Sequence, residues 1–584
     1  MKIRRIWGPP GTGKTTTLAR RVQATVRERG PDSIAIASFS VTAAQEIASR
    51  QGVKGVLPAH AVGTLHSHAY RACGHPPVAL DPKVLDDWNH QVGATWRITG
   101  QTRGPRGLES RDGAAAGNLE SGDALLEQLD LLRARAVPRS EWPAAVRTFN
   151  ARWQAWKRDA GGDAGAALDF SDMIVGAHRR ARDGEPMPGG PSVLVADESQ
   201  DMTPIEIALT LEWGKLLGDD GRLVYALDDD QAIFGWRGAD PTGILNLDDC
   251  ADEVLARSWR VPPAVHAVAE RWIERVSTRY PKLYHPRQPD PEKDPTPEHS
   301  RGWAYTVGYG LNDRGLVDAI EHDLADPDAT IMVIASCGYM LVPLIKGLRE
   351  RGIPFHNPFR PTEQAWNPLG KPGRGMSTAE RVWRYALLDE RTCGSRARAW
   401  TGDDLAAWIP LLDAKLAHLV RGAKTNLDQL PTGTVPWELV AALWRADEAG
   451  DEALRRATAG DDDPGDHLRW LSEVISPAKA KVAGYPLEVA RRRGPTALVD
   501  TPRVITGTVH SVKGGQASHV YVAPDMSGAG MRQWRGSVEG RDEIARLLYV
   551  ALTRAYHSVR VLAPTSPNAV PVRELIPPDL EVRP

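Results

Sequence analysis

A glycine-rich octapeptide near the start of the chain places the strongest constraint on its fold. Gly8-Pro9-Pro10-Gly11-Thr12-Gly13-Lys14-Thr15 follows a predicted short strand at residues 3–7 and precedes a predicted helix over about 15–29. A strand, a tight glycine loop and a helix in this order open a parallel α/β sheet. The loop also fits the G-x-x-x-x-G-K-[ST] pattern. In that pattern backbone N–H groups cradle phosphates, the lysine neutralises their oxygens and the hydroxyl holds Mg²⁺.

A second apolar run, at residues 192–196, leads into Asp197-Glu198-Ser199-Gln200-Asp201. Adjacent acids at a strand end suit a site in which Asp197 binds Mg²⁺ and Glu198 orients and deprotonates a water molecule. Capping of the following helix is the plainer explanation for two such acids. The phosphate-binding pattern at Gly8–Thr15 favours the catalytic interpretation.

A third apolar run, at residues 222–227, ends in a long mixed segment. It continues as Asp228-Asp229-Asp230-Gln231-Ala232-Ile233-Phe234-Gly235-Trp236-Arg237-Gly238-Ala239-Asp240. An amide at this strand end can sense a terminal phosphate, and aromatic rings a few residues later can stack on bases. The segment could therefore link the state of a nucleotide to the grip on a nucleic acid.

Composition narrows the class of protein. The chain has 584 residues, 42% hydrophobic and 25% charged, with a net charge of −2, which fits a globular protein of several domains. Such a chain can bind nucleic acid only through a local surface. Four scattered cysteines without a C-x-x-C pair disfavour zinc and a disulfide framework. With no signal peptide or long apolar run, we expect a cytoplasmic protein with no membrane partner. Its content of Arg, Ala, Gly and Trp indicates a GC-rich genome of bacterial or viral origin.

The order of apolar and helical segments predicts an α/β protein with two sheet-forming parts, each interrupted by a mainly helical insert. Strands are expected at 33–40, 330–336, 353–356, 503–509, 519–523 and 558–562, and helices at 43–50 and 341–351. Loops are expected at 100–122, 281–300 and 461–466. The tryptophans at 88, 96, 142, 153 and 156 occur in segments predicted to be helical and are expected to lie in the hydrophobic core.

Nine segments together resemble the superfamily 1A helicases of the UvrD/PcrA/Rep type. They occur in family order: Gly8–Thr15, Ser38–Glu46, Val62–Ser67, Leu168–Asp172, Asp197–Asp201, Asp228–Asp240, Ser258-Trp259-Arg260, Thr508–Gly514 and Tyr549–Ala555. The resemblance implies two RecA-like P-loop domains. The first core would be 1–74 with 164–252, its helical insert 75–163, the second core 253–378 with 501–584, and its insert 379–500.

The resemblance implies a 3′→5′ helicase or translocase that couples ATP hydrolysis between the cores to movement on single-stranded DNA. ATP and Mg²⁺ would be required, with Thr15 and Asp197 as metal ligands. The implied catalytic residues are Lys14, Asp197, Glu198, Gln231, Arg260 and Arg554, the two arginines acting as arginine fingers. The implied ATP-binding residues are Gly8, Pro9, Pro10, Gly11, Thr12, Gly13, Lys14, Thr15, Thr16, Trp259 and Gly514. Trp259 takes the place of a tyrosine that stacks on adenine.

The same resemblance implies contacts with single-stranded and tailed duplex DNA. The residues concerned are Phe39, Thr64, His66, Phe234, Trp236, Arg237, His510 and Ser511. Core packing remains an equal alternative for Phe234, and a structural role remains open for His66 and His510. The choice of DNA over RNA rests on the resemblance alone, since base stacking and phosphate contacts discriminate poorly.

Three departures from the family pattern affect these expectations. The adenine-reading glutamine motif upstream of Gly8 is missing, and Thr16 replaces an arginine, so other nucleoside triphosphates could serve. Lys513-Gly514-Gly515-Gln516 lacks the family's carboxylate. The 379–500 insert is shorter than usual. The alternative function is a nucleotide-gated non-catalytic or weakly unwinding subunit of a DNA repair or defence complex. The sequence does not identify a protein partner.

Overall fold

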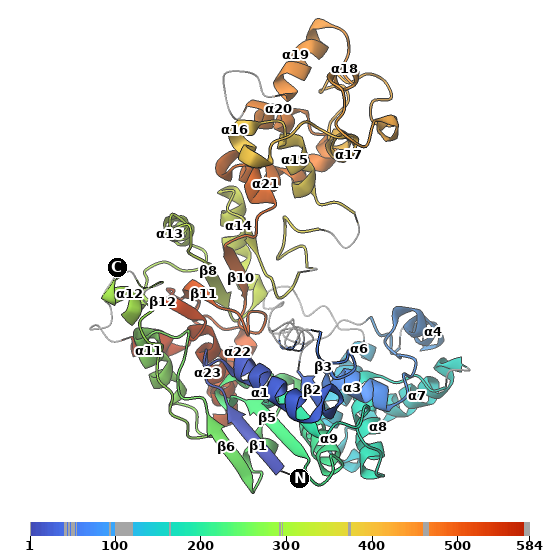
Figure 1. Cartoon of the computed structure of the whole chain (residues 1–584), viewed down its shortest axis with the longest axis vertical. Coiled ribbons are helices and arrows are strands. Elements are labelled where there is room, and N and C mark those ends of the chain that lie inside the picture. The colour runs from blue at the N-terminus through green and yellow to red at the C-terminus, as the bar shows by residue number, and fades with distance from the viewer. Residues whose placement is uncertain are drawn as a thin grey trace. The chain divides into compact units, whose positions relative to one another are not determined.

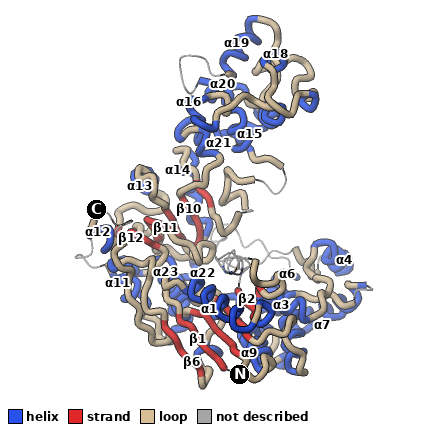
Figure 2. The backbone as a smooth tube through the Cα atoms, viewed as in Figure 1, coloured by secondary structure: helices blue, strands red, loops and turns tan. Residues whose placement is uncertain are grey.

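The computed structural model describes residues 2–39, 44, 47, 53, 55–92, 95–99, 121–162, 165–290, 292, 294, 296–361, 363–371, 375–458 and 466–576. The chain divides into two compact units, traced by residue number in Figure 1 and by secondary structure in Figure 2. Unit 1 is Met1–Thr306, Pro524–Val561 and Ser566–Pro584, and unit 2 is Val307–Ala523 and Leu562–Thr565. The four-part division predicted from the sequence remains a prediction.

The strands belong to two sheets flanked by helices, and the strand pairs within each unit are parallel. This is the mixed α/β architecture of two RecA-like domains predicted from the sequence. The strands of unit 1 are β1 (Lys2–Trp7), β2 (Ile34–Ser38), β3 (Val62–Thr64), β4 (Val193–Asp197), β5 (Arg222–Leu227), β6 (Cys250–Val254), β7 (Trp303–Thr306) and β12 (Ala555–Val561). Those of unit 2 are β8 (Ile331–Ala335), β9 (Phe355–His356), β10 (Val504–Thr508) and β11 (Ala517–Val522).

The main sheet of unit 1 has the strand order β3-β2-β4-β5-β1-β6. Strands β2 and β4 are buried along their whole length and are mainly apolar, as is typical of parallel strands covered on both faces. The side chains still alternate, because successive residues of a strand point to opposite faces. Ile34 and Ile36 of β2 join the core under α1 (Lys14–Arg29), whereas Ala35 and Ala37 join the core under the helices of the other face.

The helices of unit 1 cover both faces of this sheet. The second face is covered by α3 (Leu65–Ala72), α8 (Phe170–Arg182) and α9 (Pro204–Lys215), which share one buried cluster with the sheet. Two of these helices begin with capping boxes, Asp169 with Asp172 for α8 and Thr203 with Glu206 for α9. Unit 1 also contains α10 (Thr242–Leu245), α11 (Pro263–Ile273), α12 (Pro297–Arg301), α22 (Gly528–Gly536) and α23 (Val538–Leu552).

Between β3 and β4 the chain forms a separate helical core. It consists of α4 (Pro82–Val92), α6 (Ser121–Ala134) and α7 (Ala144–Ala160). The predicted core tryptophans are confirmed here. Those at 88, 142, 153 and 156 are at most 5% exposed, and Trp96 packs against them half-buried.

Unit 2 carries the strands β9-β10-β8-β11 in that order, with α13 (Arg314–Asp323) and α14 (Val342–Glu350). Its helical part has a tryptophan-rich core of its own. The helices there are α15 (Thr378–Ala386), α16 (Glu390–Cys393), α17 (Gly402–Trp408), α18 (Trp437–Ala441), α19 (Glu448–Ala457), α20 (Asp466–Val474) and α21 (Pro477–Arg493).

Several expected boundaries need correction. The strand predicted at 33–40 ends at Ser38, the loop predicted at 100–122 has given way to α6 at Ser121, and Asp466 already belongs to α20. The loop predicted at 281–300 gives way to α12 at Pro297, and the strand predicted at 558–562 begins at Ala555. Most of the helix predicted at 43–50, and residues 100–120 and 461–465 of the loops, lie outside the described residues. Among the helices that are described, none combines the length and apolar character needed to cross a membrane.

Candidate active site

The glycine loop leaves β1 after Trp7 and turns directly into α1. Gly11 and Gly13 have φ angles of 73° and 78°, a left-handed region that favours glycine. A Cβ at Gly11 would lie 2.6 Å from the Arg260 Cβ, and the N–H of Trp259 donates to the Gly11 carbonyl at 2.7 Å. The segment that carries Arg260 therefore packs against the loop. Because the loop ends at a helix N-terminus, its N–H groups and the helix dipole favour an anion there.

Lys14 lies at the start of α1 and faces the acids at the end of β4. Its Nζ pairs with Glu198 and lies 3.9 Å from Asp197 Oδ1. Burial disfavours the charge of Lys14, but the two carboxylates outweigh this effect and raise its pKa. Glu198 has φ +54°, an uncommon conformation for a residue with a side chain. Such strain is found where structure serves function.

A continuous series of hydrogen bonds runs from Glu198 to Arg554. Gln200 Nε2 donates to Glu198 Oε2 at 2.7 Å, and Gln200 Oε1 accepts from the N–H of Asp228 at 3.0 Å. Gln231 Nε2 donates to Asp228 Oδ2 at 2.7 Å, and Arg554 Nη2 donates to Gln231 Oε1 at 3.1 Å. Residues more than 350 positions apart in the sequence thus meet at one site inside unit 1. The sequence analysis gave Gln200 no role, although it lies within the Asp197–Asp201 motif.

The two predicted arginine fingers are both buried. Burial lowers the pKa of Arg260 to about 10, against a smaller opposing effect of Tyr284 and Tyr549. For Arg554, burial and the charge of Arg260 hold the pKa well below its usual value. Arg554 follows α23, and its Nε donates to the Val550 carbonyl at 2.8 Å. Two crowded guanidinium groups next to a phosphate-binding loop are suited to receive an anion.

The remaining residues predicted for ATP lie around the loop. The Gly8 N–H donates to the Leu227 carbonyl at 2.9 Å, and the Thr12 hydroxyl donates to the Pro9 carbonyl at 2.8 Å. Thr15 and Thr16 are half-buried in the first turn of α1, and Pro10 accepts from Ser258 Oγ. Trp259 is 72% exposed although it lies against Gly13. A large exposed ring beside the loop offers a flat apolar surface.

Four of the residues predicted for DNA form one cluster. Phe39 follows β2, and Phe234, Trp236 and Arg237 follow β5. The ring centroids of Phe39 and Phe234 are 4.9 Å apart, and those of Phe234 and Trp236 are 6.2 Å apart. The Arg237 guanidinium lies 4.9 Å from the Phe39 ring centroid. We call Phe39, Phe234, Trp236 and Arg237 the aromatic cluster.

Thr64 and His66 have structural partners in unit 1. The Thr64 hydroxyl caps α3 by accepting from the Ser67 N–H at 3.1 Å. His66 lies 3.7 Å from Glu206 and packs edge-on against Phe170, and burial lowers its pKa.

His510, Ser511 and Gly514 belong to unit 2 and follow β10. Ser511 Oγ donates to the Thr508 carbonyl at 2.9 Å and accepts from Asn357 Nδ2 at 3.1 Å. Gly514 has φ +89°. Ser511 therefore fixes the turn after β10, and Gly514 gives the chain a conformation that other residues rarely adopt.

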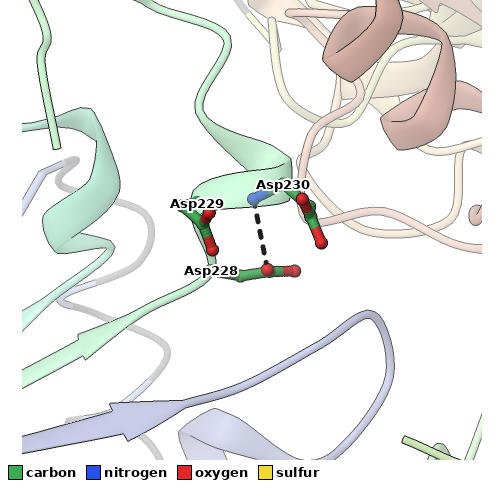
Figure 3. Close-up of side chains that lie close together, drawn as sticks. All are labelled: Asp228, Asp229 and Asp230. Carbon is green, nitrogen blue, oxygen red and sulfur yellow. Dashed lines mark hydrogen bonds between the residues drawn. The ribbon is translucent and has the colours of Figure 1, made fainter. Parts of the chain in front are cut away.

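The structure adds residues that the sequence analysis missed. The segment 281–300 was predicted only as a loop, yet Lys282 and the adjacent Arg279 bind the acids after β5, which Figure 3 shows gathered together. Asp228, Asp229 and Asp230 are each 0% exposed, and the N–H of Asp230 donates to Asp228 Oδ1 at 3.3 Å. Three adjacent acids that become buried require cations beside them. The run of acids in the sequence was therefore a signal that such cations exist. The sequence did not identify which cations these are.

Comparisons with known proteins find sequence similarity to an AAA domain and to DNA helicases. A family model described as an AAA domain matches residues 1–236. The chain is 22% identical over 298 residues to the putative ATP-dependent DNA helicase YjcD of Bacillus subtilis, a match that covers 47% of this chain and 36% of the relative. It is 27% and 26% identical over 295 residues to the DNA helicase II of Salmonella typhimurium and of Escherichia coli, covering 47% of this chain and 38% of each relative. The matches thus span well under half the length of these relatives.

Proposed function

We propose that this chain, a relative of the UvrD/Rep-type superfamily 1 helicases, hydrolyses ATP and uses the energy to move 3′→5′ along single-stranded DNA and separate strands. The observation that carries the proposal is the series of hydrogen bonds from Glu198 to Arg554 beside the glycine loop. It joins an acid suited to activate water, an amide suited to sense a phosphate and an arginine suited to neutralise charge. The direction of movement and the choice of DNA follow from the resemblance.

In this proposal the triphosphate lies on the loop from Gly8 to Gly13. Backbone N–H groups and Lys14 would bind its oxygens, and the exposed Trp259 ring would stack on the base beside Thr16. Arg260 and Arg554 would approach the terminal phosphate. The assignment of Gly514 to ATP remains a prediction from the family pattern.

The residues present suit a magnesium ion. Mg²⁺ prefers one or two carboxylate or hydroxyl oxygens together with phosphate oxygens. The Asp197 carboxyl is 2% exposed at the end of β4 and faces the first residue of α1, and Thr15 is the next residue of that helix. Magnesium held by Thr15 and Asp197 would neutralise phosphate charge when bound.

The proposed hydrolysis uses side chains already in contact. Glu198 is paired with Lys14, and phosphate oxygens would compete for that lysine. Glu198 would then be free to orient a water molecule and accept its proton, held in place by Gln200. The positive charges of Arg260 and Arg554 would stabilise charge on the transferred phosphoryl group. Elsewhere an arginine finger contributes about 10³–10⁵ in rate.

Movement on DNA is proposed to use the aromatic cluster. Its rings follow β2 and β5, and Gln231 also follows β5. Phe234 lies only three positions after Gln231, and Trp236 and Arg237 follow it in the same segment. A change in the hydrogen bonds of Gln231 would therefore be transmitted along the backbone to these side chains. Stacking on aromatic rings is worth about 1–3 kcal/mol per base. Thr64, His66, His510 and Ser511 are proposed to contact the DNA backbone.

The test is the rate of ATP hydrolysis with and without single-stranded DNA, followed by unwinding of duplexes with only a 3′ or only a 5′ tail. We expect stimulation by DNA and unwinding from the 3′ tail. Lys14→Ala and Glu198→Gln should abolish the stimulated hydrolysis. Lys215→Ala, at an exposed lysine paired with Glu212, is the control. Stimulation without unwinding would favour the weakly unwinding subunit, and retained hydrolysis in Glu198→Gln would refute the mechanism.

A further inference from the structure

The acidic cluster after β5 has the geometry of a cation site. Oxygens of Asp228, Asp229 and Asp230 lie within 4.8 Å of one another, and all three residues are fully buried. The Nζ of Lys282 lies 3.1 Å from Asp228 Oδ1, 2.5 Å from Asp229 Oδ1 and 2.8 Å from Asp230 Oδ2. The Lys282 side chain is 1% exposed. The cluster therefore receives its cation from the chain itself.

We propose that Lys282 is a positioning residue that acts as the fixed cation of the Asp228–Asp230 cluster and, through Asp228, holds Gln231 in its orientation toward Arg554. The proposal rests on the proposed function insofar as Gln231 serves nucleotide hydrolysis. The contact between Lys282 and the three acids can be tested without it.

The two oxygens of Asp228 carry the first part of the argument. Oδ1 faces Lys282, and Oδ2 accepts from Gln231 Nε2 at 2.7 Å. A carboxylate held at both oxygens has one orientation. Gln231 is then fixed as a donor to Asp228, so its Oε1 is presented to Arg554 Nη2 at 3.1 Å. Loss of Lys282 would release one end of this arrangement.

Charge balance carries the second part. Three carboxylates face two cations, because Arg279 binds Asp230 through two parallel hydrogen bonds of 2.9 and 2.6 Å. Burial disfavours the charge of Lys282, yet the three carboxylates outweigh it and raise the lysine pKa. In the described hydrogen bonds the Asp229 carboxylate accepts only from this segment, through Lys282 and the N–H of Tyr280 at 2.7 Å. Without Lys282, three buried acids would share one arginine.

The segment that carries Lys282 is itself anchored at both ends within unit 1. Tyr280 stacks on Trp7, the last residue of β1, with ring centroids 3.8 Å apart and planes at 5°. The Tyr284 hydroxyl lies 3.1 Å from that of Tyr549 in α23, the helix that precedes Arg554. Lys282 lies between these anchors. It thus joins the strand before the glycine loop, the end of β5 and the helix leading to Arg554.

The first experiment compares Lys282→Met, which keeps length and removes charge, with Lys215→Met on the exposed side of α9. We expect Lys282→Met to lower kcat for DNA-stimulated hydrolysis by about 10²-fold, the effect of a misplaced catalytic geometry, with little change in the KM for ATP. In a Gln231→Ala background the same change should lower kcat no further. Unchanged kcat, or effects of the two substitutions that multiply, would overturn the proposal.

The second experiment needs no enzymatic activity. Lys282→Ala removes the resident cation and leaves three carboxylates around the space. Added Ca²⁺ or Mn²⁺ should then raise the unfolding temperature of this variant by more than that of the wild-type chain, because both proteins share the proposed magnesium site at Thr15 and Asp197. Equal shifts in both proteins, or none in the variant, would refute the role of Lys282 as the cation of the cluster. If the variant does not fold, Lys282→Ala with Asp229→Asn reduces the charge excess and permits the same measurement.

The two experiments separate the possible failures. A wild-type chain that does not hydrolyse ATP would refute the proposed function, while the metal-dependent unfolding would still test Lys282. Normal hydrolysis in Lys282→Met together with metal-dependent stability in Lys282→Ala would support Lys282 as the cation of the acidic cluster. The same result would refute its role in positioning Gln231.

Discussion

Replacing Arg554 by methionine should separate stability from activity. Arg554 is 1% exposed, and the described hydrogen bonds from it go to neutral oxygens of Val550, Gln231 and Thr553 at 2.8, 3.1 and 3.4 Å. Such bonds contribute about 0.5–1.5 kcal/mol each. Burial of an ion costs several kcal/mol, and the charge of Arg260 adds to this cost, as the lowered pKa of Arg554 indicates. These hydrogen bonds and the charges of Glu198 and Asp228, which favour the cation, do not offset that cost, because the pKa of Arg554 remains well below its usual value.

We therefore expect Arg554→Met to leave the unfolding free energy unchanged or to raise it by about 1–4 kcal/mol, the range found when buried charges are replaced by apolar residues of similar volume. Activity should respond in the opposite sense. Loss of an arginine finger should reduce DNA-stimulated ATP hydrolysis by about 10³–10⁵, which corresponds to about 4–7 kcal/mol of transition-state stabilisation. Thermal unfolding and steady-state hydrolysis of the same preparation measure both.

Arg133→Met is the matched contrast. Arg133 is also buried, but it pairs with Asp169 at 3.3 Å and with Asp172 at 3.4 Å. Its removal takes away one of the two cations that these acids face, since Lys157 also pairs with both, and the excess buried negative charge should cost up to about 3–5 kcal/mol. A loss of stability in Arg554→Met as large as that in Arg133→Met would refute the argument, because Arg554 would then be a structural brace. Hydrolysis within tenfold of wild type would refute its catalytic role.

Two further outcomes follow. Trp236→Ala should leave DNA-stimulated hydrolysis largely intact but slow unwinding of a 3′-tailed duplex, because it removes one ring of the aromatic cluster, and unwinding at the wild-type rate would exclude Trp236 from the DNA path. Acidification should destabilise the fold through His68, whose Nε2–H donates to the Ile36 carbonyl while Nδ1 accepts from Arg71. Burial lowers the pKa of His68 to about 4, so the unfolded chain binds a proton first. Stability should fall by up to about 3 kcal/mol between pH 6.5 and 4, and His68→Gln should reduce that loss in denaturant titrations at the two pH values.

The sheet of unit 1 could be predicted because its determinants are local. A glycine loop between a strand and a helix, and apolar runs that end in acids, identify parallel strands without knowledge of their partners. The period of two within β2 then assigns Ile36 and Ala37 to opposite faces. Strand ends were less predictable, as the end of β2 at Ser38 shows. The end of a strand is set by where its pairing with neighbouring strands stops, and the composition of the strand does not reveal that position.

Contacts of the site that span long stretches of sequence were not predictable from spacing. Arg279 and Lys282 occur in a segment rich in proline and charged residues, a composition that indicates a loop. Their acidic partners lie 49 to 54 positions earlier in the sequence. Only the fold brings β5 beside this segment. The left-handed conformation of Glu198 is equally invisible in the sequence, because the residue type does not require it. These features depend on tertiary packing, whereas the glycine loop depends on its own residues.

The buried cations of unit 1 fall into two classes, and the difference indicates where an anion can bind. Lys282 and Arg133 face carboxylates at hydrogen-bonding distance or close to it, so their charges are already compensated. Arg260 and Arg554 lie together beside the glycine loop, and burial lowers the pKa of both. Each of these arginines bears a desolvation cost, which the negative charge of a phosphate would offset. Of the buried cations considered, these two would therefore be stabilised most by a bound anion. Lys14 lies between the classes, because Glu198 compensates it but is also the proposed base. Binding of a triphosphate would therefore compensate the charges of the two arginines and release Glu198 from Lys14 in the same step. Triphosphate binding would thus be coupled to activation of the proposed base. The end of β5, which Lys282 holds, would not need to rearrange.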